Sequence, residues 1–139
     1  MTKRLTIDSS VIISSLLENE SRHGEAMQIW DAVIAGGDVA IMPYSVFVEV
    51  VAAIRRRTGS EELATEVKEE LLKIENVSFV ILDQRAAEEA ADIAIQKGVR
   101  GMDALVIQTA SEYETELITF DDEMMKKYKG NDHVTSRNA

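Results

Sequence analysis

The sequence predicts an α/β fold in which a central parallel sheet of four or five short strands has helices on both faces. Short apolar runs rich in Val and Ile alternate with segments of helical periodicity along the chain. Strands that alternate with helices are joined by right-handed crossovers, which give a parallel sheet covered on both sides. A length of 139 residues without internal repeats or linkers indicates one domain.

The first third of the chain is expected to form one β-α-β unit. Gly36 and Gly37 stop its second helix, and Pro43, the only proline, ends its second strand. The expected elements are a strand at 5–7, a helix at 9–17, a loop at 19–24, a helix at 25–35 and a strand at 39–42.

Residues 45–54 are apolar on all sides except at Glu49. A helix that is apolar all round is usually buried. A strand is the alternative, because valine is frequent here. The start at Pro43 and the arginines before Gly59 favour a helix.

The second half of the chain continues the alternation. Ser60 and Asp83 are expected to cap helices, and Gly98 to end one. The expected elements are a helix after residue 60, a strand at 77–82, helices at 84–97 and 101–110, a strand at 117–119 and a helix at 123–128. We expect the folded domain to span residues 1–130, with 131–139 a polar tail that is either a short edge strand or disordered.

Composition excludes several classes of function. Cysteine is absent, so there are no disulfides, thiolate metal sites or cysteine nucleophiles. Apolar runs are far shorter than a membrane span, so we expect no membrane partner and a cytoplasmic protein. The net charge of -10 argues against a general polyanion-binding surface. Any contact with nucleic acid must therefore use a local site.

Glu49 is the most informative acid, because apolar residues surround it in sequence on both sides. A buried carboxylate is costly unless it is protonated, paired with a base or bound to a metal. A salt bridge to Arg55, Arg56 or another base is therefore an alternative to metal ligation.

The other candidate acids each have a simple structural explanation. Asp8 follows the first strand, where it can cap the next helix. Asp103 lies in the first turn of its helix, where the macrodipole favours an anion. Asp121 and Asp122 can form a turn and cap before the last helix. Taken singly, these acids are weak indications of a site.

Taken together, four acids are predicted to meet at one edge of the sheet. Asp8 and Asp121 both end strands at that edge, and Asp103 begins a helix there. Glu49 lies about one turn into the helix that follows the second strand. Four carboxylates would repel one another strongly without a divalent cation, and oxygen ligands without His or Cys favour Mg²⁺ or Mn²⁺.

Four blocks of the sequence resemble the signature blocks of PIN domains, in the same order. They are residues 5–11, 45–50, 103–106 and 117–121. The chain also has a length similar to that of VapC-type toxins of prokaryotic toxin–antitoxin pairs. The resemblance implies an acidic quartet of Asp8, Glu49, Asp103 and Asp121, supporting hydroxyls at Ser10 and Thr119, and an extra acid at Asp122. One departure is Gln108, where a small residue is common.

The expected activity is hydrolysis of RNA phosphodiester bonds by a PIN-like endonuclease. Mg²⁺ or Mn²⁺ would be bound by Asp8, Asp103 and Asp121, with a second ion near Glu49, and would lower the pKa of a bound water. Basic residues expected to help bind phosphate are Arg55, Arg56, Arg57, Lys97 and Arg100. The resemblance implies a homodimer and a small antitoxin as partners, besides the RNA substrate.

Two other functions remain open from the sequence. A receiver-type phosphoacceptor module also has acids at strand ends, but it carries paired acids after its first strand, whereas here the pair is Asp121 and Asp122. A PIN-like scaffold that binds partners without cutting is the second alternative, although the complete quartet argues against it.

Overall fold

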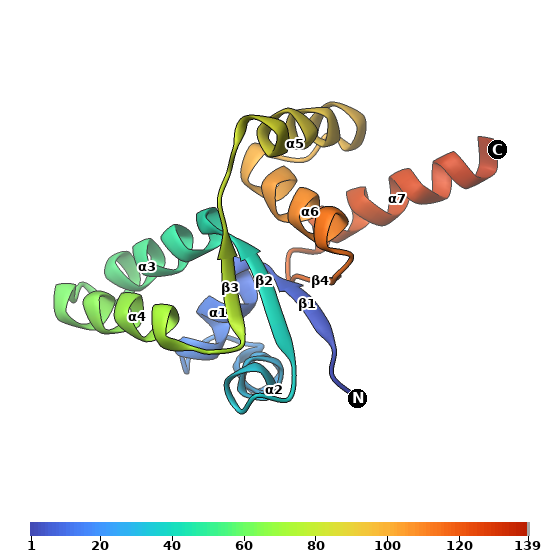
Figure 1. Ribbon diagram of the computed structural model, residues 1–139. Coiled ribbons are helices and arrows are strands. Elements are labelled where there is room, and N and C mark those ends of the chain that lie inside the picture. The colour runs from blue at the N-terminus through green and yellow to red at the C-terminus, as the bar shows by residue number, and fades with distance from the viewer. Residues whose placement is uncertain (139) are drawn as a thin grey trace.

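A computed structural model describes the backbone of residues 1–138 and the side chains of residues 1–130. Its described part holds a four-stranded sheet in the order β3-β2-β1-β4, with all neighbours parallel (Figure 1). The elements are β1 (Arg4–Ile7), α1 (Ser9–Leu16), α2 (His23–Ile34), β2 (Val39–Pro43), α3 (Tyr44–Thr58), α4 (Glu61–Lys73), β3 (Val77–Val80), α5 (Gln84–Lys97), α6 (Gly101–Tyr113), β4 (Glu116–Ile118) and α7 (Asp122–Asn138).

The predicted fold class is confirmed, with four strands rather than five in the described chain. Residues 45–54 are helical, within α3, so the strand alternative is wrong. The C-terminal tail differs from the expectation of an edge strand or disorder, because α7 runs on to Asn138. No proline follows Pro43 to stop a helix there. The domain boundary at residue 130 stays a prediction, and Ala139 lies outside the described residues.

Two layers of helices cover the sheet. The chain moves from β1 to β2 to β3 in one direction, and α1, α2, α3 and α4 contact one another along one face. It then returns to β4 at the opposite edge, and α6 packs on β1, β2 and β4 (Figure 1). Right-handed crossovers put the helices of these two halves on opposite faces. The strand order therefore reverses between β1 and β4, and ligands of open α/β sheets bind at such a switch point.

The register of β1 against β4 positions the first acid. Ile7 pairs with Ile118, and the next amide, Asp8 N–H, donates to the Ile118 carbonyl at 2.8 Å. Ile7 is fully buried in a core that includes Met42 and Val46. Burial of this apolar end of β1 fixes where Asp8 emerges at the carboxyl edge.

The helix ends agree with the sequence in part. The Ser60 hydroxyl accepts a hydrogen bond from Leu63 N–H at 3.0 Å, and the Asp83 carboxylate accepts one from Ala86 N–H at 2.9 Å, as predicted. Asp8 occupies the cap position of α1 but makes no side-chain cap bond. Its carboxylate is therefore available for other contacts. None of the helices in the described chain is long and apolar enough to cross a membrane.

Candidate functional site

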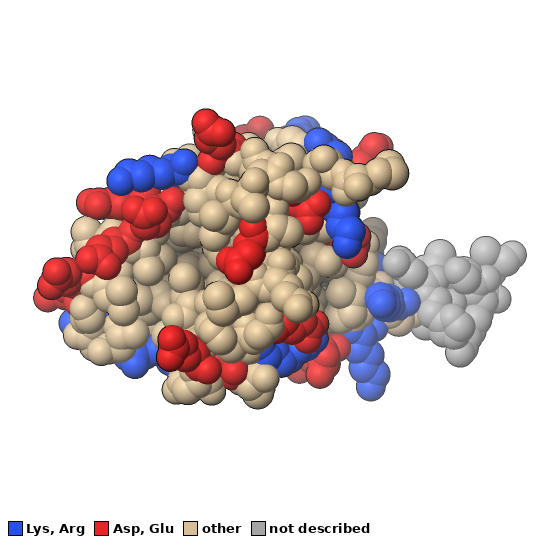
Figure 2. Space-filling view, turned by 90° about the horizontal axis from the view of Figure 1, so that it is seen from below, with Lys and Arg blue, Asp and Glu red and all other residues tan. Residues whose placement is uncertain are grey.

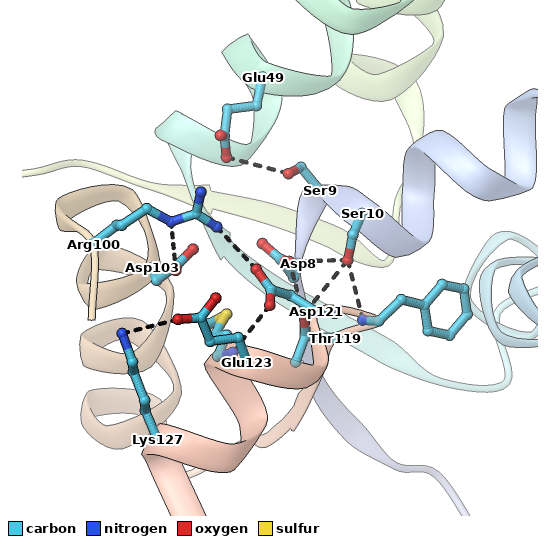
Figure 3. Close-up of polar contacts among 12 residues, drawn as sticks. Asp8, Ser9, Ser10, Glu49, Arg100, Asp103, Thr119, Asp121, Glu123 and Lys127 are labelled. Carbon is cyan, nitrogen blue, oxygen red and sulfur yellow. Dashed lines mark hydrogen bonds and ion pairs between the residues drawn. The ribbon is translucent and has the colours of Figure 1, made fainter. Parts of the chain in front are cut away.

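Two hydroxyl groups hold the carboxylate of Asp8. Asp8 is 6% exposed, and its Oδ2 accepts hydrogen bonds from Ser10 Oγ at 2.9 Å and Thr119 Oγ1 at 2.8 Å (Figure 3). The same hydroxyls accept from the backbone of the β4–α7 loop, Ser10 from Phe120 N–H at 3.1 Å and Thr119 from Asp121 N–H at 3.0 Å. Within the described chain, no group donates to the other oxygen, Oδ1. Asp8 is thus fixed through one of its two oxygens.

Glu49 comes to this edge from the second turn of α3. Its Oε1 accepts a hydrogen bond from Ser9 Oγ at 3.2 Å. Burial has the largest effect on the pKa of Glu49 and raises it, and the negative charges of Asp8 and Asp103 raise it further. The hydrogen bond from Ser9 lowers this pKa but does not cancel the rise. An ion pair with Arg55 or Arg56 is not present among the described contacts, so that alternative is wrong. Glu49 is thus a half-buried acid, and it lies close enough to Asp8 and Asp103 for their charges to raise its pKa.

Asp103 and Asp121 share one arginine. Arg100 Nη2 lies 3.0 Å from Asp121 Oδ2, and Arg100 Nε lies 3.5 Å from Asp103 Oδ2. Asp121 Oδ1 also accepts from Met124 N–H at 3.0 Å, which caps α7. Asp103 is only 15% exposed, and burial raises its pKa more than Arg100 lowers it. The charges of Asp8 and Asp121 raise it further.

Four acids from four elements therefore meet at the switch point of the sheet. Figure 3 shows Asp8, Asp103 and Asp121 around the guanidinium group of Arg100, with Glu49 extending toward it from α3. We call this set, with Arg100, the rim cluster. Its four acids are Asp8, Glu49, Asp103 and Asp121.

The rim cluster has the donor chemistry of a site for a hard cation. As the described side chains lie, no three His, Cys, Asp or Glu residues are arranged to hold a metal ion. The guanidinium of Arg100 contacts two of the acids, and it leaves the pKa of Glu49 and Asp103 raised. Carboxylate and hydroxyl oxygens without sulfur or imidazole fit Mg²⁺ or Mn²⁺. A bound divalent ion would supply the positive charge that Arg100 alone does not.

The other predicted site residues lie in different places. Asp122 is exposed in the first turn of α7. Arg55 lines a separate cavity between α3 and α4 that none of the four acids lines, and Arg56 is exposed at the end of α3. Ser9, which donates a hydrogen bond to Glu49, was not among the site residues predicted from the sequence. The pair of hydroxyl residues directly after Asp8 was the available indication of it.

An open cavity of about 620 Å³ leads away from the rim cluster. Glu49, Arg100 and Asp103 line one side, and small side chains of α5, including Ala87 and Ala91, line the other. Figure 2 shows acidic and basic side chains interspersed around a face that is otherwise neither, without a continuous basic surface. This agrees with the net charge of -10, and any polyanion must meet a local site.

The fold and the rim cluster define an α/β protein with a four-carboxylate site at the switch point of its sheet. The chain belongs to the PIN domain family, whose model matches residues 5–131. The crystal structure of Mycobacterium tuberculosis VapC20, described as a Sarcin-Ricin loop cleaving toxin, has a similar fold: it is 18% identical, with a TM-score of 0.74 over 87% of this chain and 92% of that one. The search of curated proteins found no match. The predicted family is confirmed, and the receiver alternative loses its support.

Proposed function

We propose that this protein is a divalent-metal-dependent endoribonuclease that hydrolyses RNA phosphodiester bonds. The observation that carries the proposal is the meeting of four acids at the switch point, where Glu49 and Asp103 have raised pKa values. Membership of the PIN domain family supports it, and so does the likeness in fold to an RNA-cleaving toxin.

The catalytic roles follow from how each acid is held. Asp8, Asp103 and Asp121 are proposed to bind Mg²⁺ or Mn²⁺, and Glu49 a second ion. The bound metal supplies a water of lowered pKa and positive charge for the phosphate. Ser10 and Thr119 orient Asp8 by holding one of its oxygens, so that the other faces the ligand. Asp122 is proposed to be an extra acid of the site, next to Asp121.

RNA binding must be local in so acidic a protein. Arg100, in the rim cluster, is the proposed phosphate contact at the site, because its guanidinium group would lose its pairs with Asp103 and Asp121 if these carboxylates held a metal ion. Arg55 and Arg56 are proposed to contact RNA farther along α3.

The partners proposed besides RNA are a small antitoxin and a second copy of the chain, in the cytoplasm. Apolar side chains at the start of α3 and after β3 support the homodimer, because Ile81 is 78% exposed and Tyr44 and Leu82, which line the same cavity, are exposed too. Light scattering of the purified protein tests this, and a Leu82→Glu variant is expected to shift a dimer toward the monomer.

Incubation with a structured RNA tests the proposed activity. Cleavage is expected with Mg²⁺ or Mn²⁺ and not with EDTA. Asp8→Asn is expected to abolish it while the protein keeps its circular dichroism spectrum. The matched control is Asp31→Asn, an exposed aspartate on α2, which should cut at the wild-type rate. RNA that binds but stays intact under every metal would favour the non-catalytic scaffold instead.

A further inference from the structure

A second cavity adjoins the rim cluster on the side of α1 and the β4–α7 loop. It has a volume of about 370 Å³, and its lining includes Ser10, Glu20, Arg22, Arg57 and Phe120. We call it the arginine cavity. None of the four rim acids lines it.

Two hydrogen bonds connect the arginine cavity to Asp8. Ser10 Oγ donates to Asp8 Oδ2 at 2.9 Å, and the N–H of Phe120 donates to Ser10 Oγ at 3.1 Å. Phe120 is also the residue directly before Asp121. A molecule in this cavity would therefore lie next to a group bound at the rim cluster.

The cavity combines two guanidinium groups with an aromatic ring. The Arg22 guanidinium carbon lies 3.8 Å from the centre of the Phe120 ring. Arg22 and Arg57 keep 42% and 41% of their side chains exposed. Planar guanidinium groups bind phosphate through paired N–H donors, and both guanidinium and aromatic planes stack on nucleobases. This is the chemistry that recognises a single nucleotide.

The walls of the cavity are held in place without a ligand. His23 Nδ1 hydrogen-bonds the Ser14 carbonyl at 2.8 Å, which ties the start of α2 to α1. Arg57 Nη2 lies 2.9 Å from Glu20 Oε2, which ties the α1–α2 loop to the end of α3. Such exposed ion pairs contribute little to stability. Arg22 is paired in the same way, because its Nε and Nη2 donate to Glu25 at 2.9 to 3.2 Å. Since both pairs are exposed, a phosphate can replace either carboxylate at little cost in stability.

We propose that the arginine cavity binds the RNA nucleotide next to the scissile phosphate. Arg22 and Arg57 contact the phosphate of that nucleotide, and the stacked Arg22 and Phe120 planes support its base. The inference rests on the proposed ribonuclease function, since it is the cut strand that continues into the cavity. It also brings two arginines, each paired with one glutamate in the absence of RNA, to the site of a protein whose net charge is -10.

Binding, measured apart from cleavage, tests the proposal. A fluorescent single-stranded RNA of mixed sequence is titrated with Asp8→Asn protein, which does not cut, and anisotropy is recorded at several salt concentrations. Adding Arg22→Ala or Arg57→Ala is expected to weaken binding by about tenfold. Each is also expected to reduce the slope of log affinity against log salt by about 0.7, which is the loss of one phosphate contact on a single strand. Arg22→Lys should keep the salt slope but lower the affinity for RNA, because the substitution removes the planar guanidinium group and keeps the positive charge.

The matched control is Arg85→Ala, which removes an exposed arginine that is paired with two acids away from the cavity. It should bind RNA like the parent. In the protein that retains Asp8, Arg22→Ala should raise KM with little change in kcat. Parental affinity and salt slope in both alanine variants would overturn the proposal, as would a fall in kcat alone, since that indicates only a structural role for Arg22. Failure of the ribonuclease function is seen separately, as absence of cleavage by the parent with Asp8 intact.

Discussion

On α5 and α6, Arg85 lies between Glu89 and Glu112, and at the carboxyl edge of the sheet Arg100 lies between Asp103 and Asp121. Both clusters place one arginine among acids on neighbouring elements. They differ in whether the surrounding donors compensate the negative charge of the acids.

In the α5–α6 cluster the acids have enough donors. Arg85 lies 2.9 Å from an oxygen of Glu89 and of Glu112, and buried Gln108 donates to both acids, at 3.0 and 2.7 Å. The pKa values of Glu89 and Glu112 are lowered, first by the hydrogen bond from Gln108 and then by Arg85. The donors of this cluster therefore compensate the charges of its acids. The hydrogen bonds of Gln108 to both acids explain why it is accommodated where a small residue was expected.

In the rim cluster the surrounding donors do not compensate the negative charge of the acids. Burial raises the pKa of both Glu49 and Asp103, and neighbouring carboxylates add to the rise. Arg100 opposes this for both acids but does not overcome it. The uncompensated negative charge of these acids destabilises the protein without metal. Carboxylates with raised pKa values at one edge of a sheet are typical of functional sites. The two clusters thus differ in that donors of the fold compensate the acids of the first and leave the acids of the second with raised pKa values.

The largest predicted effect compares one glutamate from each cluster. Glu49→Gln is expected to lower metal-dependent RNA cleavage by about 100-fold or more, because the substitution removes a charge that binds the ion. Glu89→Gln makes the same chemical change in the α5–α6 cluster and should leave cleavage within about twofold. Initial rates on one labelled RNA under saturating Mn²⁺ measure both. Equal losses in the two variants would show that the clusters do not differ in function.

Most of the fold was predictable from the sequence because local patterns agree with the tertiary structure. The helix at α5 was predicted from its cap at Asp83 and its end at Gly98, and both are found there. The C-terminal tail was not predicted as a helix, because its polar sequence has no apolar periodicity to indicate one.

The convergence of the acids was predictable, but their partners were not. Strand ends of a parallel sheet share an edge, so the order of elements alone places Asp8 beside Asp121. The contact of Arg100 with both Asp103 and Asp121 depends on how α6 approaches α7, which no local pattern reports. The same holds for Arg22 on Phe120, which are far apart in sequence and meet only in the folded chain.

The second prediction concerns stabilisation by metal. Mn²⁺ at about 100 times its dissociation constant is expected to add about 2.7 kcal/mol to the free energy of unfolding, or roughly 5–10 °C in Tm. Arg100→Ala should lower Tm in EDTA and show a larger rise with Mn²⁺, because the ion then supplies the only positive charge in the rim cluster. Arg85→Ala should show the wild-type rise. Thermal melts with and without EDTA measure all three, and a metal response in Asp8→Asn equal to that of the wild type would contradict the site.

The third and smallest predicted effect is on the pH dependence of stability without metal. Glu49 has a raised pKa when folded, so its contribution is most favourable below its usual pKa of 4.5 and declines as pH rises toward the folded value. Glu89 has a lowered pKa, so its contribution is present above 4.5 and is lost as pH falls through the folded value. In EDTA at pH 7, Glu49→Gln should therefore raise the free energy of unfolding and Glu89→Gln should lower it, and both differences should shrink toward pH 4. Urea titrations at pH 4, 5.5 and 7 measure the two variants against the wild type. Changes of the same sign at pH 7 would mean that the charges of the rim cluster are as well compensated as those on α5 and α6, which would contradict the proposal that the rim cluster binds a cation.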